Sequence, residues 1–287
     1  MIHTSVLVKE ILDLLNLKNG DAIIDATMGE GGHTNVFLDI VGETGKVLGI
    51  EQDAEIAKRV PKIKNLVIAL GNFMDIDIIA EKNNFKNIKV ILFDLGISSW
   101  HYQESGRGFS FSRQDEPLIM KLGSEINEDL EWNSAAEIVN QVSEKELSDI
   151  FFKYGEERRA RRIAKNIVEA RRKKRIVSVG DFLKAAGIKD VKQKARIFQA
   201  LRIAVNNELL ILTKGIEHGF KILAPKGRMA IIAYHSLEDR IVKKFFNEKK
   251  KNEEAIILTK KPVTPSGEEI KLNSRARSAK MRVLEKI

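Results

Sequence analysis

Three glycines lie in the stretch DATMGEGGH from Asp25 to His33, which directly follows the short apolar segment at residues 22–24. Glycines let a backbone turn tightly and approach a ligand, and a helix that begins near His33 presents the N–H groups of its first turn. The spacing of Gly29, Gly31 and Gly32 departs from the G-x-G-x-x-G pattern of dinucleotide sites. The stretch therefore predicts a ligand-binding turn, with a plain tight turn as the alternative.

Glu51 ends the second apolar segment and lies 19 residues after Gly32. An acidic side chain at this point in a nucleotide-binding α/β fold accepts hydrogen bonds from the ribose hydroxyls. Together with the glycine turn, Glu51 predicts a nucleoside site, although Glu51 alone fits a solvated strand end equally well. Phe73 follows the third apolar segment and is placed to pack against an adenine face, with an ordinary place in the core as the alternative.

Asp94 ends the fourth apolar segment and precedes a turn that runs to Ser99. Ligands of open α/β sheets lie beyond the carboxyl ends of the strands, so we expect Asp94 to face the same crevice as Glu51. A carboxylate there can hold a substrate amine or the amino group of a cofactor. The alternative role for Asp94 is that of a helix cap or turn residue.

His235 and Ser236 follow a further apolar segment near the C-terminus. Ser236 with Asp239 three residues later predicts that Ser236 is the N-cap of a helix. His235 lies at the carboxyl end of the predicted strand, which leaves a structural and a catalytic role equally open. The five histidines show no pairing with metal-ligand spacing, so we predict no metal site.

These residues are separated by alternating strand and helix patterns. Continuous Val, Ile and Leu runs bounded by Gly and Asp are typical of strands buried on both faces, and their alternation with helices predicts βαβ units, a parallel sheet and the α/β class. The predicted strands span residues 21–28, 46–52, 66–72, 89–96, 227–235, 255–261 and 281–287. The predicted helices span residues 33–41, 53–60, 74–84, 134–142, 144–155, 156–174, 207–223 and 237–249.

The alternation stops after Gly96, and the following hundred or so residues show helical patterns with almost no strand signal. We therefore expect an α/β core formed by residues 1–102 and 204–287, interrupted by an inserted helical domain at 103–203.

Charge is distributed unevenly along the chain. Residues 1–152 carry 14 Lys and Arg against 25 Asp and Glu, whereas residues 153–287 carry 35 against 15. The predicted basic helix at 153–175 holds 11 of these basic residues and three acids, and a second cluster comprises Arg275, Arg277, Lys280 and Arg282. Such clusters favour a nucleic-acid partner for the basic half and a small ligand for the acidic half, with solvated charged surfaces as the alternative.

The composition narrows the class of protein further. The absence of cysteine excludes a disulfide scaffold and a cysteine nucleophile, and it fits a reducing compartment. We see neither a signal peptide nor an apolar stretch long enough to span a membrane, so we expect a soluble cytoplasmic protein without a membrane partner.

Eight motifs in order make the chain similar to the MraW/RsmH family of S-adenosylmethionine-dependent 16S ribosomal RNA cytosine-N4-methyltransferases. They are HTSVLVKEIL (3–12), DATMGEGGHT (25–34), FDLGISS (93–99), RGFSFSR (107–113), YGEERRARRIAKNIVEAR (154–171), FQALRIAVNNEL (198–209), YHSLEDRIVK (234–243) and NSRARSAKMR (273–282). The resemblance implies a Rossmann-like methyltransferase fold with a mostly parallel seven-stranded sheet. It also implies methyl transfer to N4 of a cytidine in the decoding centre of the small ribosomal subunit, with the inserted helical domain binding the RNA.

Carried over by motif, the S-adenosylmethionine site comprises Gly29, Gly31, Gly32, His33, Glu51, Phe73, Asp94 and His101. Three departures from the family pattern involve five residues. Glu51 replaces the usual Asp, and Trp100-His101 replaces Pro-Gln. Ile119 and Gly123 stand where the family has acids. The resemblance allows a homodimer, although no hydrophobic stripe in the sequence requires one.

For the chemical step, we expect Asp94 and groups of the following turn, including Ser98, to accept hydrogen bonds from the N4 hydrogens. His235 or water then takes the proton. Trp100, Phe109 and Phe111 are candidates to stack on the flipped base or to pack within their loop. Two other classes remain open: a nicotinamide-dependent oxidoreductase, and a ribosome-assembly factor without catalytic activity.

Overall fold

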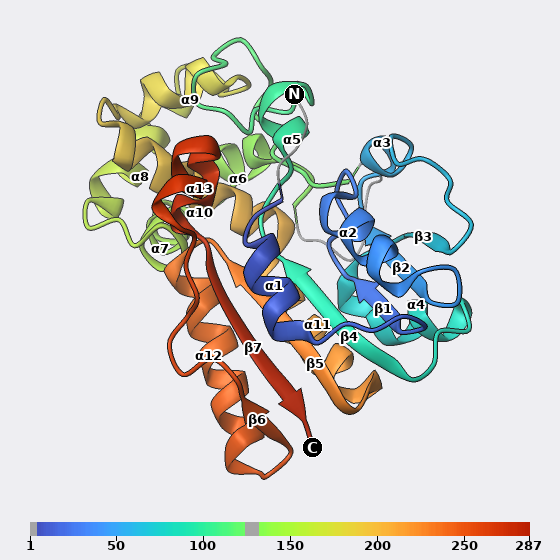
Figure 1. Ribbon diagram of the computed structural model, residues 1–287. Coiled ribbons are helices and arrows are strands. Elements are labelled where there is room, and N and C mark those ends of the chain that lie inside the picture. Colours follow the sequence, from blue (N-terminus) through green and yellow to red (C-terminus); the bar gives the residue numbers. More distant parts are fainter. Residues whose placement is uncertain (1–4, 124–131) are drawn as a thin grey trace. The chain divides into compact units, whose positions relative to one another are not determined.

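The computed structural model describes residues 5–123 and 132–287 (Figure 1). The chain forms two compact units. The first, which we call the sheet unit, comprises residues 1–96 and 209–287, and the second, the helical unit, comprises residues 97–208. The sequence placed the corresponding boundaries at 102/103 and 203/204.

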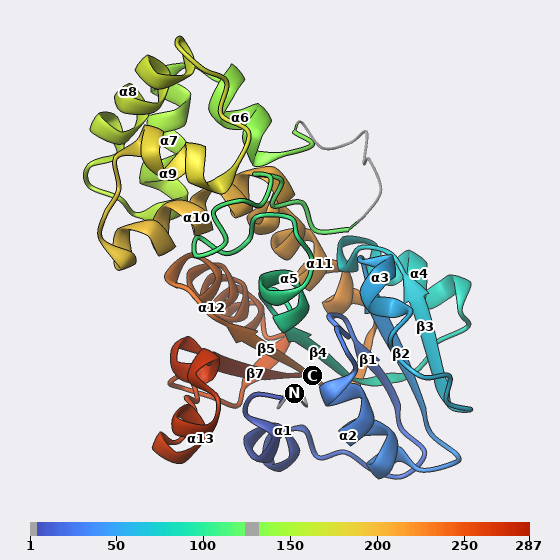
Figure 2. The same cartoon turned by 90° about the horizontal axis from the view of Figure 1, so that it is seen from above.

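The sheet unit contains a seven-stranded sheet in the order β3-β2-β1-β4-β5-β7-β6. Figure 2 shows the strands from β3 to β7 side by side in this order. The strands are β1 (Ala22–Asp25), β2 (Lys46–Glu51), β3 (Leu66–Leu70), β4 (Ile88–Asp94), β5 (Leu223–Ala233), β6 (Ala255–Ile257) and β7 (Lys280–Lys286). β1 to β5 pair in parallel, whereas β7 is antiparallel to β5 and β6 is antiparallel to β7. The strand order reverses between β1 and β4, which is where ligands of open α/β sheets bind. The predicted α/β class and the seven-stranded, mostly parallel sheet are confirmed.

Helices cover both faces of this sheet. α1 (Val8–Leu15) and α2 (Gly32–Val41) pack on one face, and α4 (Ile76–Lys82), α11 (Glu208–Ile222) and α12 (Ser236–Lys251) pack on the other. Neighbouring strand residues point to opposite faces, so Ile23 joins the core under α1 and α2 while Ile24 joins the other core. The remaining short elements of the unit are α3 (Ala54–Ala57), η1 (Phe73–Asp75), α13 (Gly267–Leu272) and η2 (Ser274–Ser278).

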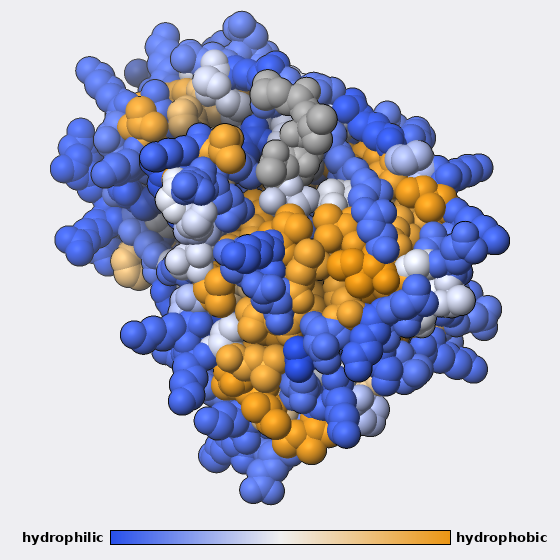
Figure 3. Space-filling view, in the orientation of Figure 1, coloured by the Kyte–Doolittle hydropathy of each residue, from blue (hydrophilic) through white to orange (hydrophobic). Residues whose placement is uncertain are grey.

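The helical unit has a hydrophobic core of its own. Its helices are α5 (Ser99–Gln103), α6 (Ala135–Gln141), α7 (Glu144–Gly155), α8 (Ala160–Arg171), α9 (Val179–Ala186) and α10 (Val191–Asn206). Leu118, Ile138, Phe151 and Phe182 are fully buried in this core. On the face drawn in Figure 3, the surface over α8 is mainly hydrophilic. Among the described residues, no helix is both long and apolar enough to cross a membrane.

The basic segment at 153–175 does not form the single helix expected at 156–174. α7 ends at Gly155, Glu156 adopts a left-handed conformation with φ 48°, and α8 begins only at Ala160. A buried carboxylate explains the break, because Glu157 accepts a hydrogen bond from the N–H of Arg159 at 2.9 Å and pairs with the guanidinium of Arg196. A continuous helix would draw Glu157 out of this arrangement.

The charge halves of the sequence also do not correspond to the two units. The helical unit carries 21 Lys and Arg against 17 Asp and Glu, and the sheet unit carries 28 against 23. The two sequence halves therefore do not coincide with the two units. The assignment of a small ligand to the acidic half and a nucleic acid to the basic half stays a prediction. The acidic first half of the sequence includes much of the helical unit, and the basic second half includes β5 to β7.

Candidate active site

The glycine turn connects β1 to α2 at the carboxyl edge of the sheet. Gly29 and Gly31 have φ values of 54° and 83°, a region that side chains other than glycine rarely adopt. Gly31 is the N-cap of α2, and Gly32 and His33 are its first two residues. The backbone of the turn therefore needs glycine at these two positions, and the first N–H groups of α2 begin directly after it.

Glu51 ends β2 and is joined to the glycine turn. Its carboxylate accepts hydrogen bonds from the N–H of Gly29 at 3.0 Å and from the N–H of Asp53 at 2.8 Å. Glu51 is only 9% exposed. The pKa of Glu51 is raised to about 7, chiefly by burial and also by the charge of Asp53, although the N–H groups of Asp53 and Gly29 act in the opposite direction. Glu51 and the glycine turn are therefore in direct contact, and their joint role in binding a nucleoside stays a prediction.

Asp94 ends β4 and is held by groups from three other segments. The hydroxyl of Tyr234 donates to one carboxylate oxygen at 2.8 Å, and Nδ1 of His33 lies 3.6 Å from the other. The N–H of Asp94 donates to Oγ1 of Thr27 at 2.6 Å. The carboxylate thus has a defined orientation between β5 and the start of α2.

A second carboxylate, Asp25, lies beneath this cluster at the end of β1 and is 1% exposed. Thr34 donates its hydroxyl hydrogen to Asp25 at 2.7 Å. Burial raises the pKa of Asp25 and the charge of Asp94 adds to the rise, whereas His33 and Thr34 oppose it. We did not select Asp25 from the sequence, although it ends a buried strand as Glu51 and Asp94 do.

His33 connects the cluster to the N-terminal segment. Its Nε2 lies 2.9 Å from the carbonyl oxygen of Val6. The next residue, Leu7, donates its N–H to a carboxylate oxygen of Glu269 in α13 at 2.8 Å. The position of the imidazole therefore depends on a segment far from it in sequence.

Phe73 begins η1, directly after β3, and is half-buried. Its ring meets Phe93 edge to face at 5.5 Å between centroids. A Cβ on Gly215 of α11 would lie 2.5 Å from the ring, so glycine at that position makes room for it. Phe73 combines a core contact with a partly accessible ring, which leaves both sequence interpretations in place.

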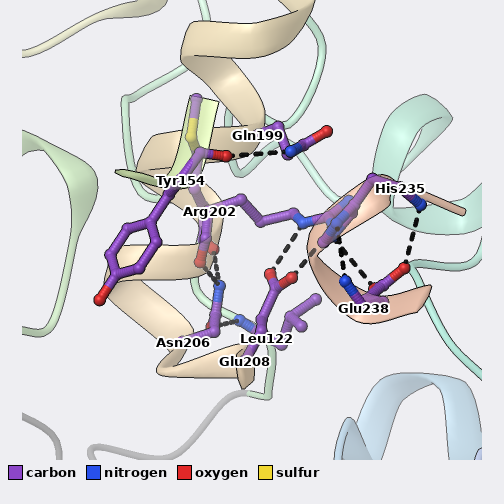
Figure 4. A network of polar contacts seen from close by, with 9 residues as sticks. Leu122, Tyr154, Gln199, Arg202, Asn206, Glu208, His235 and Glu238 are labelled. Carbon is purple, nitrogen blue, oxygen red and sulfur yellow. Dashed lines mark hydrogen bonds and ion pairs between the residues drawn. The ribbon is translucent and has the colours of Figure 1, made fainter. Parts of the chain in front are cut away.

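His235 caps α12, and the prediction that Ser236 is the N-cap is wrong. Nδ1 of His235 accepts the N–H of Glu238 at 3.4 Å, and the carboxylate of Glu238 accepts the N–H of His235 (Figure 4). The same carboxylate also accepts the N–H of Tyr234 at 2.8 Å. Nε2 of His235 lies 3.2 Å from Glu238. Ser236 is instead the first residue of the helix, and Asp239, its expected capping partner, pairs with Arg282 at 2.6 Å.

Ser98 and His101 lie in the helical unit, where they contact each other. Oγ of Ser98 lies 3.2 Å from Nδ1 of His101. His101 is 4% exposed and meets the rings of Trp100 and Phe109 edge to face. Phe111 packs against Phe198 of the same unit. The aromatic residues considered for base stacking thus have packing partners within their own unit.

The segment that departs from the family pattern, residues 119–123, is held by Asn206 at the end of α10. The Asn206 side chain donates to the carbonyl oxygen of Met120 and accepts the N–H of Leu122 at 2.7 Å (Figure 4). Lys121, 6% exposed, has a pKa lowered by burial. The chain continues beyond Gly123 into residues 124–131, which lie outside the described residues. Residues 3 and 4 of the first family motif also lie outside them.

The sheet topology and the strand-end cluster define the class of protein. A seven-stranded sheet with β7 antiparallel to β5, and with a glycine turn and acidic residues at the carboxyl ends of its strands, is the Rossmann-like methyltransferase fold. The profile of the MraW methylase family matches residues 1–287. The chain therefore belongs to the MraW methylase family and is a methyltransferase, which confirms the resemblance seen in the sequence.

Relatives match over almost their full length. A protein of Dictyoglomus thermophilum named ribosomal RNA small subunit methyltransferase H is 44% identical, over 99% of this chain and 97% of its own. A protein of the same name from Halothermothrix orenii is 41% identical, over 99% of this chain and 98% of its own. A solved structure of an rRNA methylase from Streptococcus thermophilus covers 100% of this chain and 99% of its own, with 12% identity and a TM-score of 0.47.

Proposed function

We propose that this protein transfers a methyl group from S-adenosylmethionine to the exocyclic N4 of a decoding-centre cytidine in 16S ribosomal RNA. The observation that carries the proposal is the oriented carboxylate of Asp94, at the sheet edge that also holds the glycine turn and Glu51. Family membership and the printed names of the relatives support RNA of the small ribosomal subunit as the substrate.

The residues of the sheet unit suit this methyl donor. Glu51 keeps further lone pairs for ribose hydroxyls after accepting two main-chain N–H groups. Gly29 and Gly31 let the backbone approach the ligand closely, and the accessible part of Phe73 can pack against adenine. When bound, S-adenosylmethionine supplies a methyl group on a positively charged sulfur.

Asp94 orients the nucleophile. The lone pair of cytosine N4 is delocalised into the ring, which makes the amine a weak nucleophile. A carboxylate that accepts hydrogen bonds from the N4 hydrogens favours a pyramidal nitrogen with its lone pair free for in-line attack. Tyr234 and His33 hold the Asp94 oxygens for this task. Ser98, in the turn that follows Asp94 along the chain, is a second acceptor for the amine.

Formation of the N–CH₃ bond breaks the bond between carbon and sulfur and leaves one surplus proton on the amine. The contacts of His235 favour its structural role, because both ring nitrogens face Glu238. We therefore assign the proton to water. The target base must leave its stack to be methylated, and the helical unit, with its basic segment from Lys153 to Arg175, binds the surrounding RNA. The reaction takes place on the small subunit in the cytoplasm.

Methyl transfer from labelled S-adenosylmethionine to 30S subunits, followed by nucleoside analysis of the RNA, tests the proposal. We expect N4-methylcytidine as the product and tight binding of S-adenosylhomocysteine without binding of NADH. An Asp94→Ala variant should bind the cofactor and lose turnover. Wild-type kcat in that variant, with normal cofactor binding, would exclude Asp94 from the step. Subunit binding without any methylated product would favour an assembly factor.

A further inference from the structure

A small cleft in the helical unit carries two arginines from the end of the basic segment. It lies at the end of α6 and beyond the end of α8, has a volume of about 280 Å³, and is lined by Asn140, Gln141, Arg171 and Arg175. We infer that this cleft is a binding site for a phosphate group of the RNA backbone. The inference rests on the proposed function and adds a specific anchoring point for its substrate.

Arg171 is positioned by the packing of α8. The buried stripe of this helix includes Ala164, Ile167 and Val168, and Arg171 continues the stripe at the last helical residue. Its guanidinium donates to the carbonyl oxygen of Val139 at 2.9 Å, which fixes the group against the last turn of α6. A guanidinium has five N–H donors, so this bond leaves several for a ligand.

Asn140 makes the opposite wall rigid. Its amide donates to the carbonyl oxygens of Ala136 and Ile176 at 2.7 Å each, and its oxygen accepts the N–H of Ile176 at 3.1 Å. These bonds tie the end of α6 to the strand-like segment after Arg175. The two arginines are therefore presented from a backbone that is already cross-linked, and binding an anion would require little rearrangement.

Within the described residues, no carboxylate forms an ion pair with the two arginines of the cleft. Burial lowers the pKa of Arg171 and the charge of neighbouring Arg172 lowers it further, with no acid among the causes. Arg175 is exposed and forms no ion pair within the described part of the chain. Lys174 differs, because it pairs with Asp181 at 2.9 Å. An anion in the cleft would neutralise charge that the fold itself leaves uncompensated.

Phosphate is favoured over a protein carboxylate as the occupant. Two guanidinium groups match the several oxygens of a phosphodiester, and Gln141 adds an amide. The cleft also ends the segment that begins with Arg158 and contains the densest basic run of the chain. Such a row of cations follows a nucleic-acid backbone, with the cleft as its most structured position.

The test measures binding of the full-length protein to a labelled fragment of small-subunit RNA between 50 and 300 mM salt. Arg175→Gln is the first variant, because among the described residues this exposed side chain has no partner whose loss would unfold the unit. We expect about tenfold weaker binding and a salt slope smaller by about 0.7, the value for one phosphate of a single strand. Arg171→Lys keeps the positive charge but loses the planar guanidinium that can bind two phosphate oxygens at once. We expect this variant to bind RNA more weakly as well, while its thermal unfolding stays close to that of the wild type.

Lys189→Gln is the matched control, since it removes one exposed cation from the same unit outside the cleft. Unchanged affinity and salt slope in both cleft variants would overturn the inference. So would a variant that loses binding of inorganic phosphate but keeps RNA binding, because the site would then serve a free anion. Cleft variants that lose binding to ribosomal protein but keep RNA binding would point to an acidic protein partner, and this result would also refute the inference. Failure of the wild type to methylate 30S subunits would instead refute the proposed function.

Discussion

The Tyr234 hydroxyl is the most direct contact to the Asp94 carboxylate, and it can be removed without disturbing the surrounding packing. Gly96 lies against the Tyr234 ring, where a Cβ would be 3.4 Å away, and phenylalanine preserves that surface. We expect Tyr234→Phe to lower kcat tenfold or more, since a hydrogen bond to a charged group contributes about 1.5–3 kcal/mol. Affinity for S-adenosylhomocysteine should change less than about threefold.

Single-turnover methyl transfer and calorimetry measure these two quantities separately. Tyr154→Phe, which removes a hydroxyl from the helical unit, should leave the affinity for S-adenosylhomocysteine unchanged. A Tyr234→Phe enzyme with wild-type turnover would show that the other contacts of Asp94, including those with His33 and Thr27, hold it well enough. Equal losses in turnover and in cofactor affinity would instead indicate a general disturbance of the sheet edge.

The raised pKa of Glu51 predicts pH-dependent cofactor binding. The ionised carboxylate is the form that accepts two ribose hydroxyls, and the pKa of about 7 means that it is depleted below neutrality. We expect S-adenosylhomocysteine affinity to fall as pH decreases from 8 to 6, approaching tenfold per pH unit below 7. Titrations across this range should show the dependence in the wild type and its loss in Glu51→Gln.

The same pKa has the opposite consequence for the stability of the protein without cofactor. Folding favours the neutral form of Glu51, because its pKa is raised from 4.5 to about 7. This contribution is complete below pH 4.5 and is lost as the pH rises through 7. Urea unfolding at pH 6 and 8 should therefore show a loss of stability in the wild type that Glu51→Gln lacks. An identical pH dependence in both proteins would show that Glu51 is hydrated in the folded chain.

At the scale of elements, substitutions at the start of α12 can distinguish a structural role of His235 from a chemical one. His235→Ala removes the side chain that accepts the Glu238 N–H and should lower the free energy of unfolding by about 1 kcal/mol. His235→Asn restores a capping side chain and should recover both stability and turnover. Ser236→Ala is the matched control and should be nearly neutral. Loss of turnover in a stable His235→Asn protein would identify His235 as the proton acceptor.

The elements that could be predicted are those whose pattern is local. Buried Val, Ile and Leu runs located every strand of the sheet, and α7 has the predicted bounds of 144–155. α9 and α10 were not predicted, and the break before α8 depends on Glu157 meeting Arg196, 39 residues away. Likewise, strand-end position indicated Glu51 and Asp94 separately. The Tyr234 contact to Asp94 joins residues 140 positions apart and has no local signal.

At the scale of the whole molecule, each unit has its own means of stability. The sheet unit buries two apolar layers, one on each face of the sheet, and brings together β4 and β5 across the long insertion. The helical unit buries a separate cluster that includes Phe151, Phe182 and Leu201. Both units carry a similar small excess of positive charge, so net charge does not distinguish them. The units differ in where the cations are placed, and α8 with the residues after it holds the densest group.

A separate core in one continuous segment predicts that residues 97–208 fold when expressed alone. The segment has the size of an ordinary domain, and its fully buried side chains contact one another within the unit. We expect a helical circular-dichroism spectrum, cooperative urea unfolding with a free energy of about 5 kcal/mol, and RNA binding with most of the salt dependence of the full protein. S-adenosylhomocysteine should not bind, because the glycine turn, Glu51 and Asp94 are absent. A segment that remains unfolded would mean that its core depends on the sheet unit. A folded segment that does not bind RNA would move the substrate-binding surface to the sheet unit, where Arg275 and Arg277 would be the first residues to replace.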